Sequence, residues 1–140
     1  MRKVGLLIVG VVMASMLVFA SVAVAERFTG TDGPDGIEGT SGDDRIAGGA
    51  GDDALRGLAG DDRISGDAGD DRMNGNKGKD RLFGDSGNDL MRGGRGSDYI
   101  NAFDKGEVDR VLCGRGSDDV AFVDRRDNVG SGCEQVFRRA

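Results

Sequence analysis

Aliphatic residues recur at every ninth position between residues 30 and 101. Counted from Gly30, this stretch divides into eight contiguous nine-residue units without an insertion. Position 8 of every unit is aliphatic: Ile37, Ile46, Leu55, Ile64, Met73, Leu82, Met91 and Ile100. Positions 7 and 9 are mostly polar, so each unit predicts a minimal β-strand at positions 7 to 9 with one side chain facing a core.

Two invariant glycines separate these apolar positions. Positions 1 and 4 are Gly in all eight units, and glycine permits the tight backbone curvature of a turn, so positions 1 to 6 are predicted to turn. Repeated turn-plus-strand units stack into a parallel solenoid. With two units per coil, the strands form two opposed sheets, and residues 18 apart stack about 4.8 Å from one another. The predicted fold is therefore all-β.

Position 6 is aspartate in every unit. The eight residues are Asp35, Asp44, Asp53, Asp62, Asp71, Asp80, Asp89 and Asp98. In the predicted coil they form two columns, one on each edge, and like charges about 5 Å apart repel by about 0.8 kcal/mol even in water. A hard cation reverses this effect, and Ca²⁺ suits carboxylate and carbonyl oxygens better than Mg²⁺, which keeps its water and needs rigid octahedral geometry.

These units resemble the RTX nonapeptide repeat, G-G-x-G-x-D-x-U-x, over 72 of the 140 residues. The resemblance implies a right-handed, calcium-stabilised parallel β-roll in which position-6 aspartates bind calcium between stacked turns. Four stacked aspartates on each edge leave three gaps between them, so the two edges together imply about six ions. The chain departs from the pattern at position 2, where only Gly49 and Gly94 are glycine. Leu58 adopts a left-handed conformation least readily, so the site beside it is expected to be the weakest.

A disordered Gly/Asp-rich linker is the alternative interpretation of the repeats. A linker accounts for the composition but not for eight aliphatic residues in phase, so the β-roll is preferred. Disorder before calcium binds is compatible with the β-roll, because folding and metal binding are then coupled.

Residues 102–140 break the period and are predicted to cap the solenoid. One partial unit, residues 113–121, places Asp118 at position 6 as a further ligand candidate. Cys113 and Cys133 lack the C-x-x-C spacing of redox pairs, and two cysteines make a poor zinc site. A structural disulfide that closes a loop of about 20 residues is preferred, worth roughly 3 kcal/mol. This ending resembles that of exported bacterial RTX-like calcium-binding proteins.

The N-terminus has the pattern of a signal peptide. Arg2 and Lys3 precede 22 uncharged residues, which end in the A-x-A sequence Ala23–Ala25. Cleavage would leave residues 26–29 as a short leader and remove any membrane span; the alternative is a retained anchor, because 22 such residues can cross a bilayer. Export also favours disulfide formation, and the predicted location is secreted or extracellular, with the cell surface possible.

Composition narrows the function. The chain has no histidine, which excludes Ser-His-Asp catalysis and histidine-ligated zinc. The net charge is −6, and −8 without Arg2 and Lys3, which disfavours a nucleic-acid partner. The preferred function is a secreted, non-enzymatic calcium-binding β-roll that folds on binding Ca²⁺ outside the cytosol.

An alternative function is a cell-surface or matrix protein that binds glycan or cell wall, with calcium only structural. Arg45, Arg63 and Arg81 recur 18 residues apart at position 7. They are interpreted as solvated charges that offset the acidic turns; a basic stripe for an anionic glycan is the second interpretation. An enzyme that uses paired carboxylates is least favoured, because no cleft-forming segment is visible.

Overall fold

The computed structural model describes residues 24–104 and 106–139. The predicted signal peptide lies outside this part of the chain, apart from its last two residues. Odd-numbered strands are β1 (Arg27–Thr29), β3 (Arg45–Ala50), β5 (Arg63–Ala68), β7 (Arg81–Ser86), β9 (Tyr99–Ala102), β11 (Val120–Val123) and β13 (Gln135–Arg138). Even-numbered strands are β2 (Gly36–Glu38), β4 (Ala54–Ala59), β6 (Arg72–Lys77), β8 (Leu90–Arg95), β10 (Arg110–Arg115) and β12 (Asn128–Val129).

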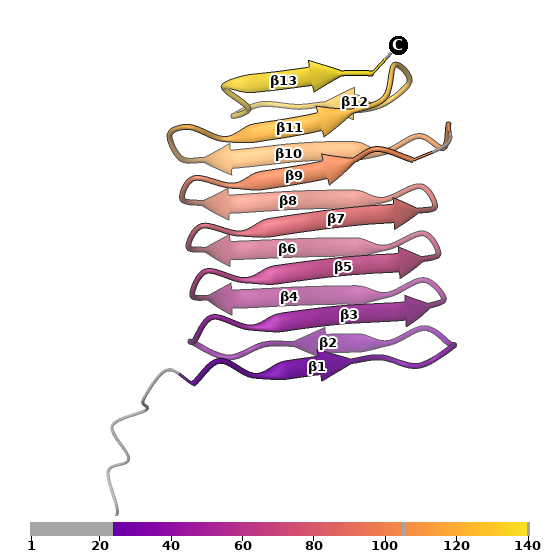
Figure 1. Cartoon of the computed structure of the whole chain (residues 1–140), viewed down its shortest axis with the longest axis vertical. Coiled ribbons are helices and arrows are strands. Elements are labelled where there is room, and N and C mark those ends of the chain that lie inside the picture. Colours follow the sequence, from indigo (N-terminus) through magenta and orange to yellow (C-terminus); the bar gives the residue numbers. More distant parts are fainter. Residues whose placement is uncertain (1–23, 105, 140) are drawn as a thin grey trace, which may run out of the picture.

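The strands wind into a parallel β-solenoid of about six turns (Figure 1). Odd-numbered strands form one seven-stranded sheet and even-numbered strands form a six-stranded sheet, each in sequence order. From β1 to β7, each strand pairs in parallel with the strand 18 residues later, as Ile46 does with Ile64 and Leu55 with Met73. The predicted coil of two nine-residue units is therefore confirmed.

The strands are longer than the sequence predicted. A typical strand such as β5 runs from position 7 through position 3 of the following unit, so the turn shrinks to positions 4 to 6. Position 2, as in Asp67, takes a left-handed conformation within this extended run, yet the pairing continues beyond it, as Ala68 with Ser86 shows. The pairing of adjacent strands thus continues through a local bend, which the alternation of apolar and polar residues does not reveal.

Position 2 is left-handed in six of the eight units. Leu58 has φ 79°, and Asp67, Asn76 and Asp85 have φ between 68° and 76°. Gly49 and Gly94 take the same region. Leucine has no side-chain oxygen to stabilise this conformation and crowds its Cβ against the backbone, so Leu58 is a point of local strain.

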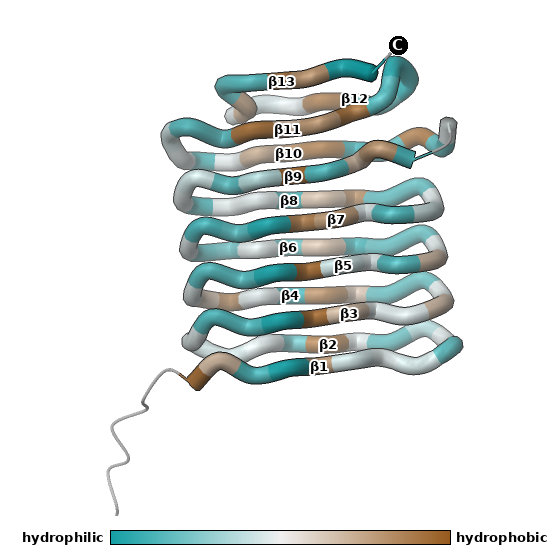
Figure 2. The backbone as a smooth tube through the Cα atoms, viewed as in Figure 1, coloured by the Kyte–Doolittle hydropathy of each residue, from teal (hydrophilic) through white to brown (hydrophobic). Residues whose placement is uncertain are grey.

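A single column of apolar side chains from each sheet fills the interior. The position-8 residues from Ile46 to Ile100 are at most 2% exposed, and Val111, Ala121 and Val123 continue the core into the cap. Figure 2 shows this core as brown segments in the middle of successive strands, with teal at most of the turns. Ile37 and Phe28, at the N-terminal end, are only partly buried because fewer turns cover them.

Residues 102–139 form the cap, which a disulfide and aromatic packing hold together. Cys113 on β10 is bonded to Cys133 just before β13, as predicted. On the outer face of the odd-numbered sheet, Tyr99 packs against Phe122 with ring centroids 5.2 Å apart, and Phe122 stacks on Phe137 at 5.0 Å. None of the described residues forms a helix that is long and apolar enough to cross a bilayer.

Candidate metal centre

The position-6 aspartates lie in two buried columns, one at each edge of the solenoid. Seven of the eight, from Asp44 to Asp98, are only 1–2% exposed. Asp35, in the first described turn that carries this position, is partly exposed. Because every position-6 residue directly precedes a strand, the register of the sheets stacks each aspartate on the one 18 residues away.

A main-chain ladder orients each carboxylate. The N–H of Asp44 donates to Oδ1 of Asp62 at 2.8 Å, and the N–H of Asp62 donates to Oδ1 of Asp80 at 2.9 Å. The other column repeats the contact, as between Asp53 and Asp71 at 2.8 Å. The fold therefore fixes one oxygen of each carboxylate and directs the other oxygen to a defined place.

The second oxygen of these carboxylates is buried without a hydrogen-bond partner. This holds for Oδ2 of Asp53, Asp62, Asp71, Asp80, Asp89 and Asp98, and for Oδ2 of Asp104 and Asp119 in the cap. A buried acceptor left unpaired costs roughly 1–3 kcal/mol, and more when it is charged. A repeated set of such oxygens is therefore unfavourable unless a cation or a proton satisfies them.

The glycines at position 1 leave open the space that these oxygens face. A Cβ at Gly39 would lie 2.6 Å from Oδ2 of Asp44 and 2.7 Å from the carbonyl oxygen of Gly57. Gly57, one coil later, stands in the same relation to Asp62 and the carbonyl oxygen of Gly75. Carboxylate and carbonyl oxygens thus border one small space per turn, and any side chain at position 1 would enter it.

Burial raises the pKa of these carboxyl groups, and neighbouring aspartates add to the shift. The pKa of Asp89 rises to about 8, mainly because burial disfavours the charged form and then because Asp109 and Asp71 are close. Asp80 reaches a pKa of about 7 and Asp62 about 6 for the same reasons. Without a cation, Asp89 and in part Asp80 therefore hold protons at neutral pH that isolated carboxylates would release.

This donor set fits a hard divalent cation. Ca²⁺ takes carboxylate and main-chain carbonyl oxygens, which are the atoms that border the space at each turn. Within residues 24–104 and 106–139, no three acidic side chains converge on one point. A cation here would accordingly take its remaining ligands from main-chain oxygens rather than from a cluster of carboxylates.

The cap continues both columns, but with a register that differs from the sequence prediction. The N–H of Asp98 donates to Oδ1 of Asp119 at 2.7 Å, whereas Asp118 is exposed and left-handed with φ 68°. One extra residue in the turn before β11 moves the frame, so that Ala121 rather than Val120 pairs with Ile100. The assignment of Asp118 to position 6 was therefore wrong, and Asp119 occupies that place.

Three further acidic residues of the cap extend the ladder, and sequence reasoning missed them. The N–H of Asp89 donates to Oδ1 of Asp109 at 2.8 Å, and the N–H of Asp109 donates to Oδ1 of Asp127 at 3.1 Å. On the other edge, Glu134 accepts the N–H of Asp119 at 2.8 Å. A search for Asp followed two residues later by an aliphatic residue finds Asp109 and Asp127, but two extra residues between Asp89 and Asp109 hid their phase.

Aspartates at position 5 form a second, outer ladder that runs in the opposite direction. Oδ1 of Asp43 accepts the N–H of Asp61 at 2.8 Å, and Oδ1 of Asp61 accepts the N–H of Lys79 at 2.8 Å. Asp52 and Asp70 do the same on the other edge. These residues are solvent-exposed, and they also satisfy main-chain donors of the next turn.

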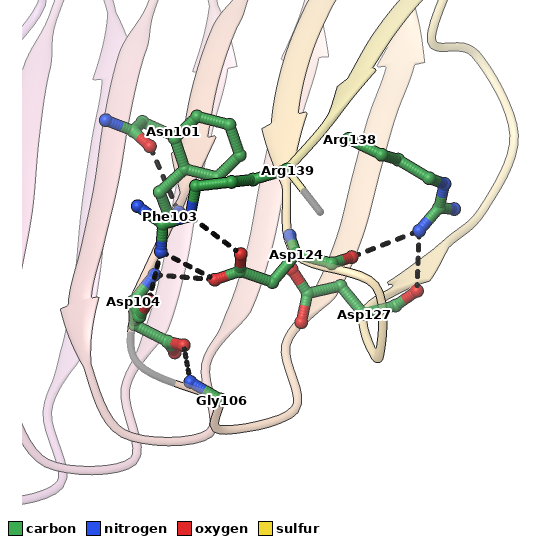
Figure 3. Close-up of polar contacts among 8 residues, drawn as sticks. All are labelled: Asn101, Phe103, Asp104, Gly106, Asp124, Asp127, Arg138 and Arg139. Atoms are coloured by element: carbon green, nitrogen blue, oxygen red, sulfur yellow. Dashed lines mark hydrogen bonds and ion pairs between the residues drawn. The ribbon is translucent and has the colours of Figure 1, made fainter.

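In the cap, Arg138 and Arg139 contact two aspartates, Asp124 and Asp127 (Figure 3). Arg139 Nε lies 3.2 Å from Oδ1 of Asp124, and Arg138 Nη1 donates to the carbonyl oxygens of Asp124 and Asp127. Asp104 donates its N–H to Oδ2 of Asp124 at 3.0 Å. The last strand is thereby tied to the turns beneath it.

The class that this geometry defines is a parallel β-solenoid with stacked aspartate turns. Residues 29–64, 50–82 and 65–100 match the family described as the RTX calcium-binding nonapeptide repeat (4 copies), which together is just over half of the chain. The protein therefore belongs to this family, whose repeats bind calcium. No curated protein and no solved structure matches the chain.

Proposed function

We propose that this protein is an exported, non-enzymatic calcium-binding β-roll that folds when it meets calcium outside the cytosol. The observation that carries the proposal is the recurring Oδ2 atom of position 6, buried and unpartnered from Asp53 to Asp98. Calcium supplies the positive charge that these stacked carboxylates lack, and each ion stabilises the turns on both sides of it.

The proposed ligands in the repeats are the eight position-6 aspartates, Asp35 to Asp98, with main-chain carbonyl oxygens beside them. Three gaps along each column give about six ions in this region. In the cap, Asp119 replaces Asp118 as the candidate, because it occupies the ladder position and its Oδ2 is unpartnered. Asp109 and Asp127 are additional candidates on the opposite edge.

Coupling of folding to calcium follows from the balance of forces in the repeats. The core offers one aliphatic side chain per nine residues. Each coil also buries two carboxylates whose second oxygen has no hydrogen-bond partner. Burial of charge without a partner opposes folding, so the chain is expected to stay open where calcium is scarce. Calcium outside the cell then closes the roll.

Export is supported by two features. The N-terminal segment has the pattern of a cleaved signal peptide, with Ala25 as the last residue removed. The Cys113–Cys133 disulfide fits an oxidising compartment. The non-enzymatic role is supported by the hydrogen bonds that the buried aspartates accept from main-chain N–H groups, because these bonds hold one oxygen of each carboxylate in the fold.

Isothermal titration of the metal-free protein with calcium tests this proposal. We expect about six ions to bind in the repeats, with magnesium binding much more weakly. Binding of one ion or none, or equal binding of magnesium, would contradict it. N-terminal sequencing of the protein recovered from the culture medium tests export, and we expect it to begin at Glu26.

A second candidate function is interaction with a cell-surface or matrix glycan while calcium holds the fold. The observation that favours it is the row of exposed arginines on the odd-numbered sheet. This candidate leads to the inference below.

A further inference from the structure

We propose that the arginine row, defined as Arg27, Arg45, Arg63 and Arg81, binds a linear acidic polysaccharide along the axis of the solenoid. The ligand class is a chain of uronic acids, with one carboxylate on each sugar. This inference rests on the proposed function, because only the calcium-folded roll brings the four residues together.

The four side chains are direct neighbours on one sheet face. The register pairs Arg27 with Arg45, Arg45 with Arg63, and Arg63 with Arg81, and all four are exposed. Adjacent strands lie about 4.8 Å apart. Like charges placed directly opposite one another destabilise a sheet, so the row has a cost that the fold itself does not require.

No acidic side chain in the described part of the chain offsets the row by an ion pair. The two ion pairs found there join Arg56 to Glu38 and Arg139 to Asp124. No guanidinium of the row lies within ion-pair distance of a carboxylate in these residues, so the four side chains are solvated. Four cations thus remain available to an external anion.

A shallow groove of about 200 Å³ runs beside the row. Its lining includes Arg27, Arg45 and Arg63 and the small residues Thr29, Ala47 and Ser65. Small side chains let a flat polymer approach the sheet closely. At the end of the groove, the guanidinium carbon of Arg63 lies 4.0 Å from the centroid of the Phe83 ring, which restricts that side chain and reduces the entropy lost on binding.

The spacing and chemistry favour a uronic acid chain. Guanidinium groups bind carboxylates through two parallel hydrogen bonds, and a uronic acid chain carries a carboxylate on each sugar, so one chain can meet several guanidinium groups of the row. Phosphates along one strand of a nucleic acid duplex lie about 3.4 Å apart along the axis, which does not match the spacing of the strands. The net charge of −6 also disfavours nucleic acid.

Calcium controls this surface as well as the fold. Each arginine of the row from Arg45 to Arg81 directly follows a position-6 aspartate, and a second groove is lined by one aspartate column and by the row, including Asp62, Arg63, Asp80 and Arg81. Without calcium, the roll stays open and the row does not form. With calcium in the turns, the ions offset the charge of the aspartates and the arginines dominate the field at the groove.

Fluorescence anisotropy with a labelled oligomer of galacturonic acid, in saturating calcium, tests the proposal. The variant R45Q/R63Q/R81Q removes three cations from the row. The matched control R72Q/R92Q/R110Q removes three exposed cations from the outer face of the other sheet. We expect the first variant to bind about tenfold more weakly and the control to stay within about threefold of the unaltered protein.

Circular dichroism in calcium, run on all three proteins, separates the two proposals. If the roll forms and no oligomer binds, the arginine row proposal fails and the calcium proposal stands; if the roll does not form, both fail. Equal loss in the two variants overturns the proposal, because binding then follows net charge alone. Tighter binding to single-stranded DNA or phosphatidylserine vesicles also overturns it, while a heparin oligomer distinguishes sulfate from carboxylate as the recognised group.

Discussion

Asp44 and Asp62 are joined by a hydrogen bond from the main-chain N–H of Asp44 to Oδ1 of Asp62, at 2.8 Å, while Oδ2 of Asp62 is buried and unpartnered. One oxygen therefore serves the fold and the other is free for a ligand. The same division of roles recurs along both columns. It explains why position 6 is aspartate in all eight units.

Replacing Asp62 by asparagine should weaken calcium binding by roughly tenfold at the affected sites, because affinity follows the number of charged ligands. The amide oxygen can still accept the N–H of Asp44, so the ladder is preserved. In chelator the same change should stabilise the roll, since it removes a buried carboxyl whose pKa is raised to about 6. Isothermal titration and thermal melting measure the two effects.

Asp61→Asn is the matched control for that prediction. Asp61 is exposed, and its Oδ1 accepts the N–H of Lys79, which an asparagine oxygen can also do. Calcium affinity should change less than about threefold, through the loss of one surface charge. An equal effect of the two variants would contradict the assignment of position 6 as the ligand.

Gly57→Ala should abolish calcium binding at the turn of Asp62. Its Cβ would meet Oδ2 of Asp62 and the carbonyl oxygen of Gly75, two of the oxygens assigned to the ion. Gly36→Ala is the control, because nothing lies within 4 Å of its Cβ. Titration should find fewer ions in the first variant and an unchanged number in the second. An unchanged number in Gly57→Ala would place the ion elsewhere.

The calcium-free roll should lose stability as the pH rises from about 4 to about 8. Burial raises the pKa of Asp89 to about 8 and that of Asp80 and Asp109 to about 7, whereas in the unfolded chain they titrate near 3.9. The folded state therefore binds more protons in this window, and stability decreases with pH until the folded pKa is passed.

Circular dichroism in chelator checks the sign of this pH effect. The β signal should be stronger at pH 5.5 than at pH 8, with light scattering as a control for aggregation. In calcium the trend should reverse, because protons compete with the ion for the same oxygens. A calcium-free protein that is more folded at pH 8 would contradict the account of the buried columns.

Leu58→Gly should stabilise the calcium-bound roll by about 1 kcal/mol. Leu58 has φ 79°, which costs an L-residue roughly 1–2 kcal/mol and glycine much less. Ala59→Gly, one residue later and outside the left-handed region, should instead destabilise by about 0.5–1 kcal/mol. Denaturant unfolding in calcium measures both, and a loss of stability in Leu58→Gly would refute the assignment of strain.

The sequence was sufficient to predict the solenoid because its two determinants recur without interruption. Ile46 and Ile64 stack as their spacing predicts, and so do Asp44 and Asp62. Strand length was not predictable, because the pairing of Asp67 with Asp85 depends on a left-handed residue inside a strand. In the cap, the turns differ in length from those of the repeats. The nine-residue spacing therefore predicts Asp118 at position 6, whereas the structure has Asp119 there.

The most direct test of the central claim is circular dichroism of the metal-free protein during a calcium titration, with magnesium as the control. A cooperative gain of β signal in calcium, absent in magnesium, is the predicted result, complete by about 1 mM as in weak extracellular sites. A spectrum that stays unchanged up to about 10 mM calcium would contradict the claim that calcium completes this fold.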